Sequence, residues 1–177
     1  MDTEVLSMNA AEIIQVFDSC FVRSHATHLV GGGTEPLYLP NTESDLAQLI
    51  FRDDYASSAL HEAAHWCLAN NGRRRQTDFG YRYIQPPRSF AEQRQFYRLE
   101  LRSQSLEWHF SQAAGVAFSI SSDNVVDGAV HDRKLLRLED AFSRQLHDQH
   151  KLTQAWLCTR GGNRATAFIS ALSRANG

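Results

Sequence analysis

The sequence predicts a helix-dominated α+β fold with a small sheet, organised as a single domain over residues 1–177. Two observations support this fold class. Apolar residues recur at helical spacing through most of the chain, and short apolar runs near residue 50 have the character of buried strands. No internal repeat or long linker divides the chain. A chain of 177 residues also has the size of one domain, able to bury about two thirds of its unfolded surface.

The first predicted helix begins at Asn9, because Asn9 and Glu12 have the spacing of a capping box. Apolar residues then recur on one face, and three glycines at 31–33 are expected to end this region. The prolines within 35–40 favour an extended run, and the apolar residues 49–51 are typical of a buried strand.

The clearest predicted helix covers residues 54–70, which are rich in Ala and Leu, before a stop at Asn71 and Gly72. A second capping box at Ser89 and Glu92 begins a long helix towards Ala114, for which we allow a break near Ser103. Apolar spacing predicts two further helices, one around 135–146 and one from Asn163 to 172.

Composition narrows the class of protein. A net charge of -2 and a pI near 6.4 argue against a general nucleic-acid-binding protein. The three cysteines are far apart and form no pair typical of a disulfide framework or a thiolate zinc site. The acidic start at residues 1–4 does not resemble a secretory signal, and no apolar run is long enough for a membrane span. We therefore expect a cytoplasmic protein.

The motif that could bind a metal is His61-Glu62-x-x-His65, which lies inside the clearest predicted helix. Residues four apart lie on one face of a helix, so both imidazoles can bind one cation, with Glu62 within reach of a metal-bound water. Apolar residues surround the motif, which argues against two solvated histidines. We predict a metal site at His61 and His65; the other six histidines do not enter this prediction.

The third protein ligand must come from farther along the chain, and the next long helix offers Glu92, Glu100, Glu107 and His109. Glu92 is better explained as a helix cap, and Glu107 is as easily a solvated residue. Glu100 is the carboxylate most embedded in apolar sequence, where an unpaired charge would be costly, and is the preferred ligand.

A set of two histidines and one carboxylate suits two metals. With zinc and an activated water it would be a hydrolase site in which Glu62 acts as the general base. With iron(II) it would be an oxygenase site with open positions for dioxygen and substrate. The spacing of these residues does not choose between the two.

The chain resembles the bacterial elongation factor P hydroxylase family through several blocks that keep their order. Besides the histidine motif, which Trp66 and Cys67 follow, these blocks are Glu35-Pro36-x-Tyr38-x-Pro40, Asp78-Phe79-Gly80-Tyr81-x-Tyr83, Leu106-x-Trp108, Ala113-Ala114-Gly115 and Asp123-Asn124. The resemblance spans about residues 10 to 172 and is far more specific than the five-residue motif alone.

The resemblance implies a cytoplasmic protein-lysine hydroxylase of the non-haem iron monooxygenase type, with residues 1–177 as its metal-dependent domain. Its substrate would be the lysine of elongation factor P that carries an attached β-lysine, and dioxygen would be the cosubstrate. His61, His65 and Glu100 would hold Fe(II), with zinc possible in the isolated protein. Under this interpretation Glu62 would orient a ligand or water, or hold the cationic end of the substrate.

The charge is unevenly distributed. The segment from Gly72 to Arg102 contains eight arginines and three acidic residues. Its net charge is therefore +5, in a chain whose net charge is -2. Such runs are often only solvated, but a basic surface could also steer an acidic partner, for which elongation factor P would be suited. Candidate substrate-binding residues in this segment are Arg73, Arg74, Arg75, Asp78 and Tyr81, with Tyr83 beside them.

Two other classes of function stay open at this stage. A zinc metallopeptidase would use the same histidine motif and would be indifferent to oxygen. A protein with a purely structural metal would need four closed ligands. Nucleic acid is an unexpected partner, since the arginine triplet lacks interleaved aromatic residues.

Overall fold

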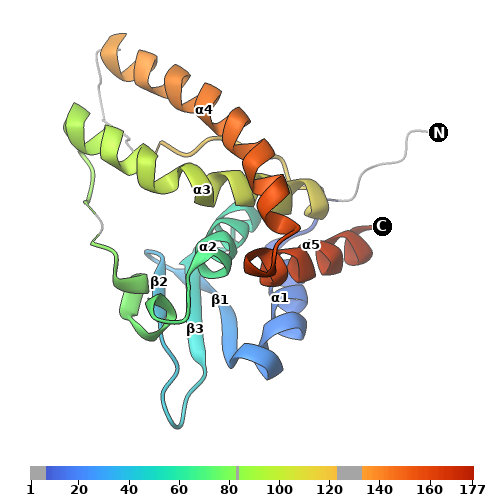
Figure 1. Ribbon diagram of the computed structural model, residues 1–177. Helices are drawn as coiled ribbons and strands as arrows, with labels where there is room; N and C mark the ends of the chain where they lie inside the picture. The colour runs from blue at the N-terminus through green and yellow to red at the C-terminus, as the bar shows by residue number, and fades with distance from the viewer. Residues whose placement is uncertain (1–6, 83, 123–132) are drawn as a thin grey trace.

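A computed structural model describes residues 7–82, 84–122 and 133–177. Within these ranges five α-helices and three strands follow one another with three short 3-10 turns (Figure 1). They are α1 (Ala10–His25), β1 (Thr27–Gly33), β2 (Leu37–Leu39), β3 (Ala47–Arg52), α2 (Ala56–Leu68), η1 (Arg73–Arg75), η2 (Thr77–Gly80), α3 (Phe90–Ala114), α4 (Arg133–Leu157), η3 (Arg160–Gly162) and α5 (Asn163–Asn176). The predicted helix-dominated α+β fold is confirmed. The acidic start of the chain, Tyr83 and Asp123-Asn124 lie outside the described residues.

The sheet has the strand order β1-β3-β2, with β3 parallel to β1 and antiparallel to β2. The expectation that the glycines at 31–33 end a helical region was wrong, because α1 ends at His25 and these glycines belong to β1. A side chain at Gly33 would lie 2.7 Å from the Ile50 side chain and 2.9 Å from the Glu35 carbonyl oxygen. Glycine therefore permits the close approach of this strand to its neighbours.

Both predicted capping boxes form. The Asn9 side chain accepts from the Glu12 N–H and the Ser89 side chain from the Glu92 N–H, and each glutamate accepts from the cap residue's N–H in return. The break allowed near Ser103 does not occur, because α3 is continuous through it. Ser103 is buried and its hydroxyl contacts His65, so packing keeps this residue within the helix.

The main core lies between the sheet and the helices α1, α2, α3 and α5. Phe17 of α1 makes edge-on ring contacts with Trp66 of α2 and Phe168 of α5, and Phe168 in turn contacts Phe110 of α3. Figure 1 shows α3 and α4 crossing above this core as a pair of long helices. The fully buried Trp66 directly follows the histidine motif, so the core fixes the helix that carries it.

A second, smaller cluster joins α3 and α4, where the Tyr97 and Phe142 rings stack at 4.3 Å beside Leu146.

None of the helices in the described ranges has the length and apolar character needed to cross a lipid bilayer.

Candidate metal centre

The imidazoles of His61 and His65 converge on one point. Their Nε2 atoms are 3.1 Å apart, and both rings project from the same face of α2, as the four-residue spacing requires. The carboxylate of Glu100, from α3, bridges them: each of its oxygens lies 3.3 Å from one of the two Nε2 atoms. The potential ligand atoms of the three residues all lie within 4.8 Å of one another.

The outward nitrogen of each imidazole also has a partner. His61 Nδ1 lies 2.8 Å from a carboxylate oxygen of Glu107, and His65 Nδ1 lies 3.2 Å from the Ser103 hydroxyl. A hydrogen bond at Nδ1 fixes the ring orientation and, where Nδ1 donates, leaves the Nε2 lone pair free for a cation. The two partners therefore aim both Nε2 atoms at the same position.

The sequence left open whether Glu107 is a ligand candidate or a solvated residue; it is not solvated, because it is buried at 5% exposure. A detectable signal was present in the sequence. Glu100, Ser103 and Glu107 are spaced by three and then four residues, which places all three on one face of a helix. Hence α3 presents the carboxylate between the imidazoles and both outer partners from a single face.

The ionisable groups of this cluster shift one another's pKa values. Burial lowers the pKa of His61, but the Glu107 and Glu100 carboxylates outweigh it and raise that pKa well above its ordinary value. Burial raises the pKa of Glu100, but His65 and His61 reverse this, so the pKa of Glu100 is lowered. The Glu100 oxygen that lies 3.3 Å from His61 Nε2 is nevertheless buried, and this contact does not have the geometry of a hydrogen bond. An anionic site with an unsatisfied carboxylate oxygen and two convergent imidazoles fits a divalent cation.

Glu62 lies beside this cluster but is not bonded to it. Burial raises the pKa of Glu62, and His65, His61, Glu100 and Glu107 all act on it electrostatically. It forms no hydrogen bond or ion pair within the described part of the chain, and its side chain is partly exposed. Within the described ranges no other side chain holds its carboxylate.

The end of α2 is held by a residue distant in sequence. One guanidinium nitrogen of Arg164, on α5, donates to the carbonyl oxygens of Cys67 at 2.9 Å and Ala69 at 2.7 Å. The same guanidinium lies 5.1 Å from the centre of the Trp66 ring, and that of Arg74 lies 5.2 Å from it. Arg164 therefore acts as a charged C-terminal cap for the helix that carries both histidines.

Of the three consecutive arginines 73–75, two make side-chain contacts within the described residues and one does not. Arg73 donates to the Phe79 carbonyl oxygen at 3.2 Å and lies 4.4 Å from the Tyr81 ring centre, while the half-buried Arg74 donates to the Asn71 side chain. Arg75 is exposed and has no side-chain partner in the described residues. Two of the three arginines are thus engaged in holding η1 and η2.

Asp78 and Tyr81 lie in or next to η2, which packs on β2 (Figure 1). A carboxylate oxygen of Asp78 accepts from the Tyr38 N–H at 3.0 Å, and Tyr81 is exposed. The structure places neither in hydrogen-bonding contact with the histidine and glutamate cluster. Their role in substrate binding stays a prediction.

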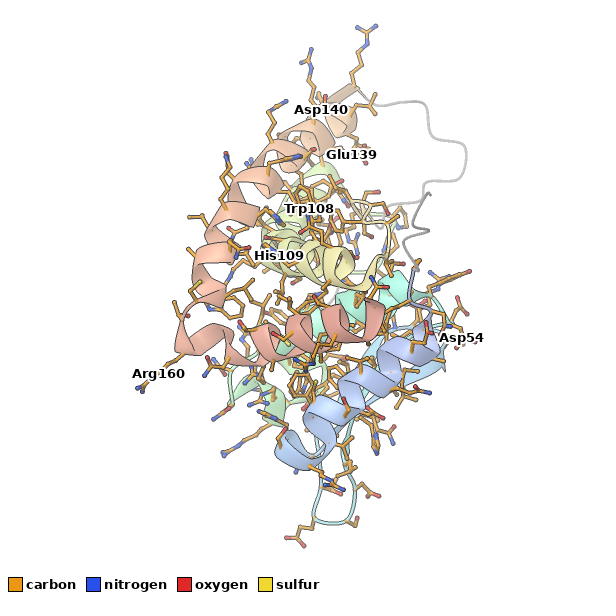
Figure 2. The ribbon with its side chains drawn as sticks, turned by 90° about the vertical axis from the view of Figure 1, so that its right-hand side faces the viewer. Asp54, Trp108, His109, Glu139, Asp140 and Arg160 are labelled. Carbon is orange, nitrogen blue, oxygen red and sulfur yellow. The ribbon has the colours of Figure 1, made fainter. Side chains whose placement is uncertain are left out.

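The described histidines outside the cluster occupy other surroundings. His109 and His150 stack at 3.8 Å between α3 and α4, with His150 also against Trp108, and Figure 2 shows Trp108 and His109 on this side of the molecule. His28 pairs with Asp18 at 2.9 Å. None of these joins a cluster with a third potential metal ligand in the described ranges.

Two histidines from one helix and a carboxylate from a second helix define a candidate mononuclear site of the His, His, carboxylate class. The chain belongs to the elongation factor P hydroxylase family, whose pattern matches residues 16–176. It is also 44% identical over 115 residues to the elongation factor P lysine hydroxylase of Haemophilus influenzae. That match covers 64% of this chain and 65% of the relative, which is just under two thirds of the relative's length.

Proposed function

We propose that this chain is a metal-dependent hydroxylase that adds one oxygen atom to a modified lysine of elongation factor P. The observation that carries the proposal is the convergence of His61, His65 and Glu100 in a chain of this family. The printed name of the Haemophilus influenzae relative supports elongation factor P as the substrate. A substrate of the translation machinery would place the enzyme in the cytoplasm.

His61, His65 and Glu100 are the proposed ligands, and iron(II) is the proposed metal, although zinc could replace it in the isolated protein. Iron(II) in such a site supplies the redox chemistry and the open positions that a reaction with dioxygen requires. A Glu107 carboxylate oxygen lies 2.8 Å from His61 Nδ1, positioned to accept a hydrogen bond from it, and the Ser103 hydroxyl lies 3.2 Å from His65 Nδ1. These contacts hold both imidazoles in an orientation that suits a cation and, where Nδ1 donates, in the tautomer that a cation needs.

Glu62 is proposed to hold the cationic amine of the modified lysine. Its carboxylate has no partner within the described residues, and an approaching ammonium group would favour its ionised form. Glu62→Gln should keep the metal but raise the KM for modified elongation factor P. If this variant retains both full metal content and wild-type kinetics, Glu62 does not hold the substrate.

Arg75 is the member of the triplet best suited to steer an acidic partner, because Arg73 and Arg74 are engaged. Arg75→Ser should slow association with elongation factor P at low salt and flatten its salt dependence. Asp78 and Tyr81 lie in or next to η2, the turn that follows η1, and are proposed as weaker contacts of the substrate.

The direct test combines metal analysis with mass spectrometry. The protein is purified without oxygen, its metal content is measured, and it is then incubated with β-lysylated elongation factor P, dioxygen and a reductant. We expect iron in the protein and a mass gain of one oxygen on the substrate, both lost in His61→Ala. Stoichiometric zinc without a mass gain would instead favour a metallopeptidase.

A further inference from the structure

A polar pocket lies at the C-terminal end of α2, the helix that carries His61 and His65. Its volume is about 570 Å³, and its walls come from the end of α2, from α3 and from the junction between α4 and α5. The residues with side chains of chemical interest are Arg102, Arg160, Arg164, Trp156 and Asn71. Figure 2 shows Arg160 projecting from the corner between α4 and α5.

The pocket is cationic, and no residue that the structure describes neutralises its charge. No acidic residue lines it, and Arg102, Arg160 and Arg164 form no ion pair in the described part of the chain. Arg164 is engaged with the α2 carbonyls, but its Nε is buried without a partner. Arg102 and Arg160 are exposed, so two guanidinium groups remain available to an anion.

We propose that this pocket receives an acidic side chain of the protein substrate and so docks elongation factor P beside the metal centre. This inference rests on the proposed function for the identity of the partner. The chemistry itself is a carboxylate held by the guanidinium groups of Arg102 and Arg160.

The lining favours a protein carboxylate over other anions. Leu68 and Trp156 give the pocket apolar walls beside its arginines. These walls can pack against the methylene groups of Glu or Asp, whereas inorganic phosphate would use the arginines alone. The Arg102 guanidinium lies over the Trp156 ring, 5.8 Å from its centre, so a nucleic-acid base that stacked on this face would have to displace it.

The position also suits a docking role. Leu68 follows His65 by three residues on α2, an axial rise of about 4.5 Å, and Arg102 follows Glu100 by two residues on α3. Two helices that supply the metal cluster therefore also supply the pocket. A partner bound there would be anchored on the same two helices, although on a different face of α3 from Glu100, and this anchoring raises the local concentration of its lysine.

The test compares the full-length wild type with Arg102→Ser/Arg160→Ser and a charge-matched control, Arg137→Ser/Arg144→Ser. The control arginines are exposed on α4 and lie outside the pocket; Arg144 precedes Trp156 by an axial rise of about 18 Å. Calorimetry gives the Kd for elongation factor P at low and high salt. We expect Kd to rise about 10-fold in the pocket variant at low salt, less at high salt, and to stay near wild type in the control.

Further measurements separate docking from chemistry. Hydroxylation at saturating substrate should be unchanged in the pocket variant, with only KM raised. Equal Kd values in the pocket variant and the control would overturn the docking proposal, as would the absence of any binding by the wild type. Arginine-dependent binding of inorganic phosphate or of a short RNA instead would assign the pocket to that ligand and also overturn it. Arginine-dependent binding of elongation factor P without oxygen addition would support docking and overturn the proposed reaction alone.

Discussion

Glu107 offers the sharpest test of the metal centre, through Glu107→Gln. The substitution keeps the shape of a side chain that is 5% exposed but removes the charge facing His61 Nδ1 at 2.8 Å. Loss of such an outer partner of a metal ligand typically weakens metal binding 10- to 100-fold, or about 1.4–2.7 kcal/mol. We expect an effect in this range because the contact is short, buried and charge-assisted.

The variant should also change the pH dependence of metal binding. Burial lowers the pKa of His61, and Glu107 and Glu100 outweigh it, so the pKa is raised and a proton competes with the metal. Apparent affinity in the wild type should therefore fall as pH drops below this raised pKa. Without the Glu107 charge the pKa of His61 decreases, and the loss of metal should begin at a lower pH.

The assay is a titration of the apoprotein with cobalt(II) against a coloured chelator over a range of pH. Asp140→Asn removes an exposed carboxylate at the far end of α4 (Figure 2) and serves as the control. The expected pattern is a lower affinity plateau at high pH together with an onset of metal loss at lower pH. A plateau equal to the wild type would refute the proposed role of Glu107.

Three further predictions concern the fold around the metal helix. Burial raises the pKa of Cys67 to about 12, so a maleimide or iodoacetamide at neutral pH should label exposed Cys158 quickly and Cys67 only after unfolding; labelling of Cys67 at the Cys158 rate would contradict its burial. Arg164→Met should lower the free energy of unfolding, measured in urea, by about 2–3 kcal/mol, since water can replace only part of the hydrogen bonds from Arg164 to the α2 carbonyls. Arg174→Met, at an exposed position, is the control; equal urea midpoints for the two variants would count against Arg164 as a cap of α2. Gly162→Ala should cost about 1–3 kcal/mol by thermal unfolding, because its Cβ would lie 2.7 Å from the Leu157 Cα; an unchanged Tm would show that this junction can relax.

The parts of the fold that depend on local chemistry could be predicted from the sequence. The capping boxes at Asn9 and Ser89 involve residues three apart, and the helix around the histidine motif is favoured by its composition. The strand Thr27–Gly33 was not predicted, because it is defined by its parallel pairing with Ala47–Arg52 and its glycines resemble a helix stop. Pairing between segments distant in the chain leaves little local signal.

Some residues of the candidate site could be predicted from the sequence and others could not, for the same reason. His61 and His65 share one helix and their spacing is visible in the sequence, and Glu100 was singled out by its apolar surroundings. The role of Glu107 was left open, since burial of a single glutamate depends on the helix packed against it. Arg164 could not have been anticipated from sequence, because its carbonyl partners lie 95 to 98 residues earlier in the chain.

The long-range cap at Arg164 has a consequence for biosynthesis. Both histidines emerge from the ribosome well before α5, which supplies the guanidinium for the end of α2 and Phe168 for the ring cluster around Trp66 and Phe17. A nascent chain that ends before α5 has the ligands but lacks the packing that orders their helix, and such non-local contacts form late in folding. Efficient metal loading in the cell should consequently follow the synthesis of α5.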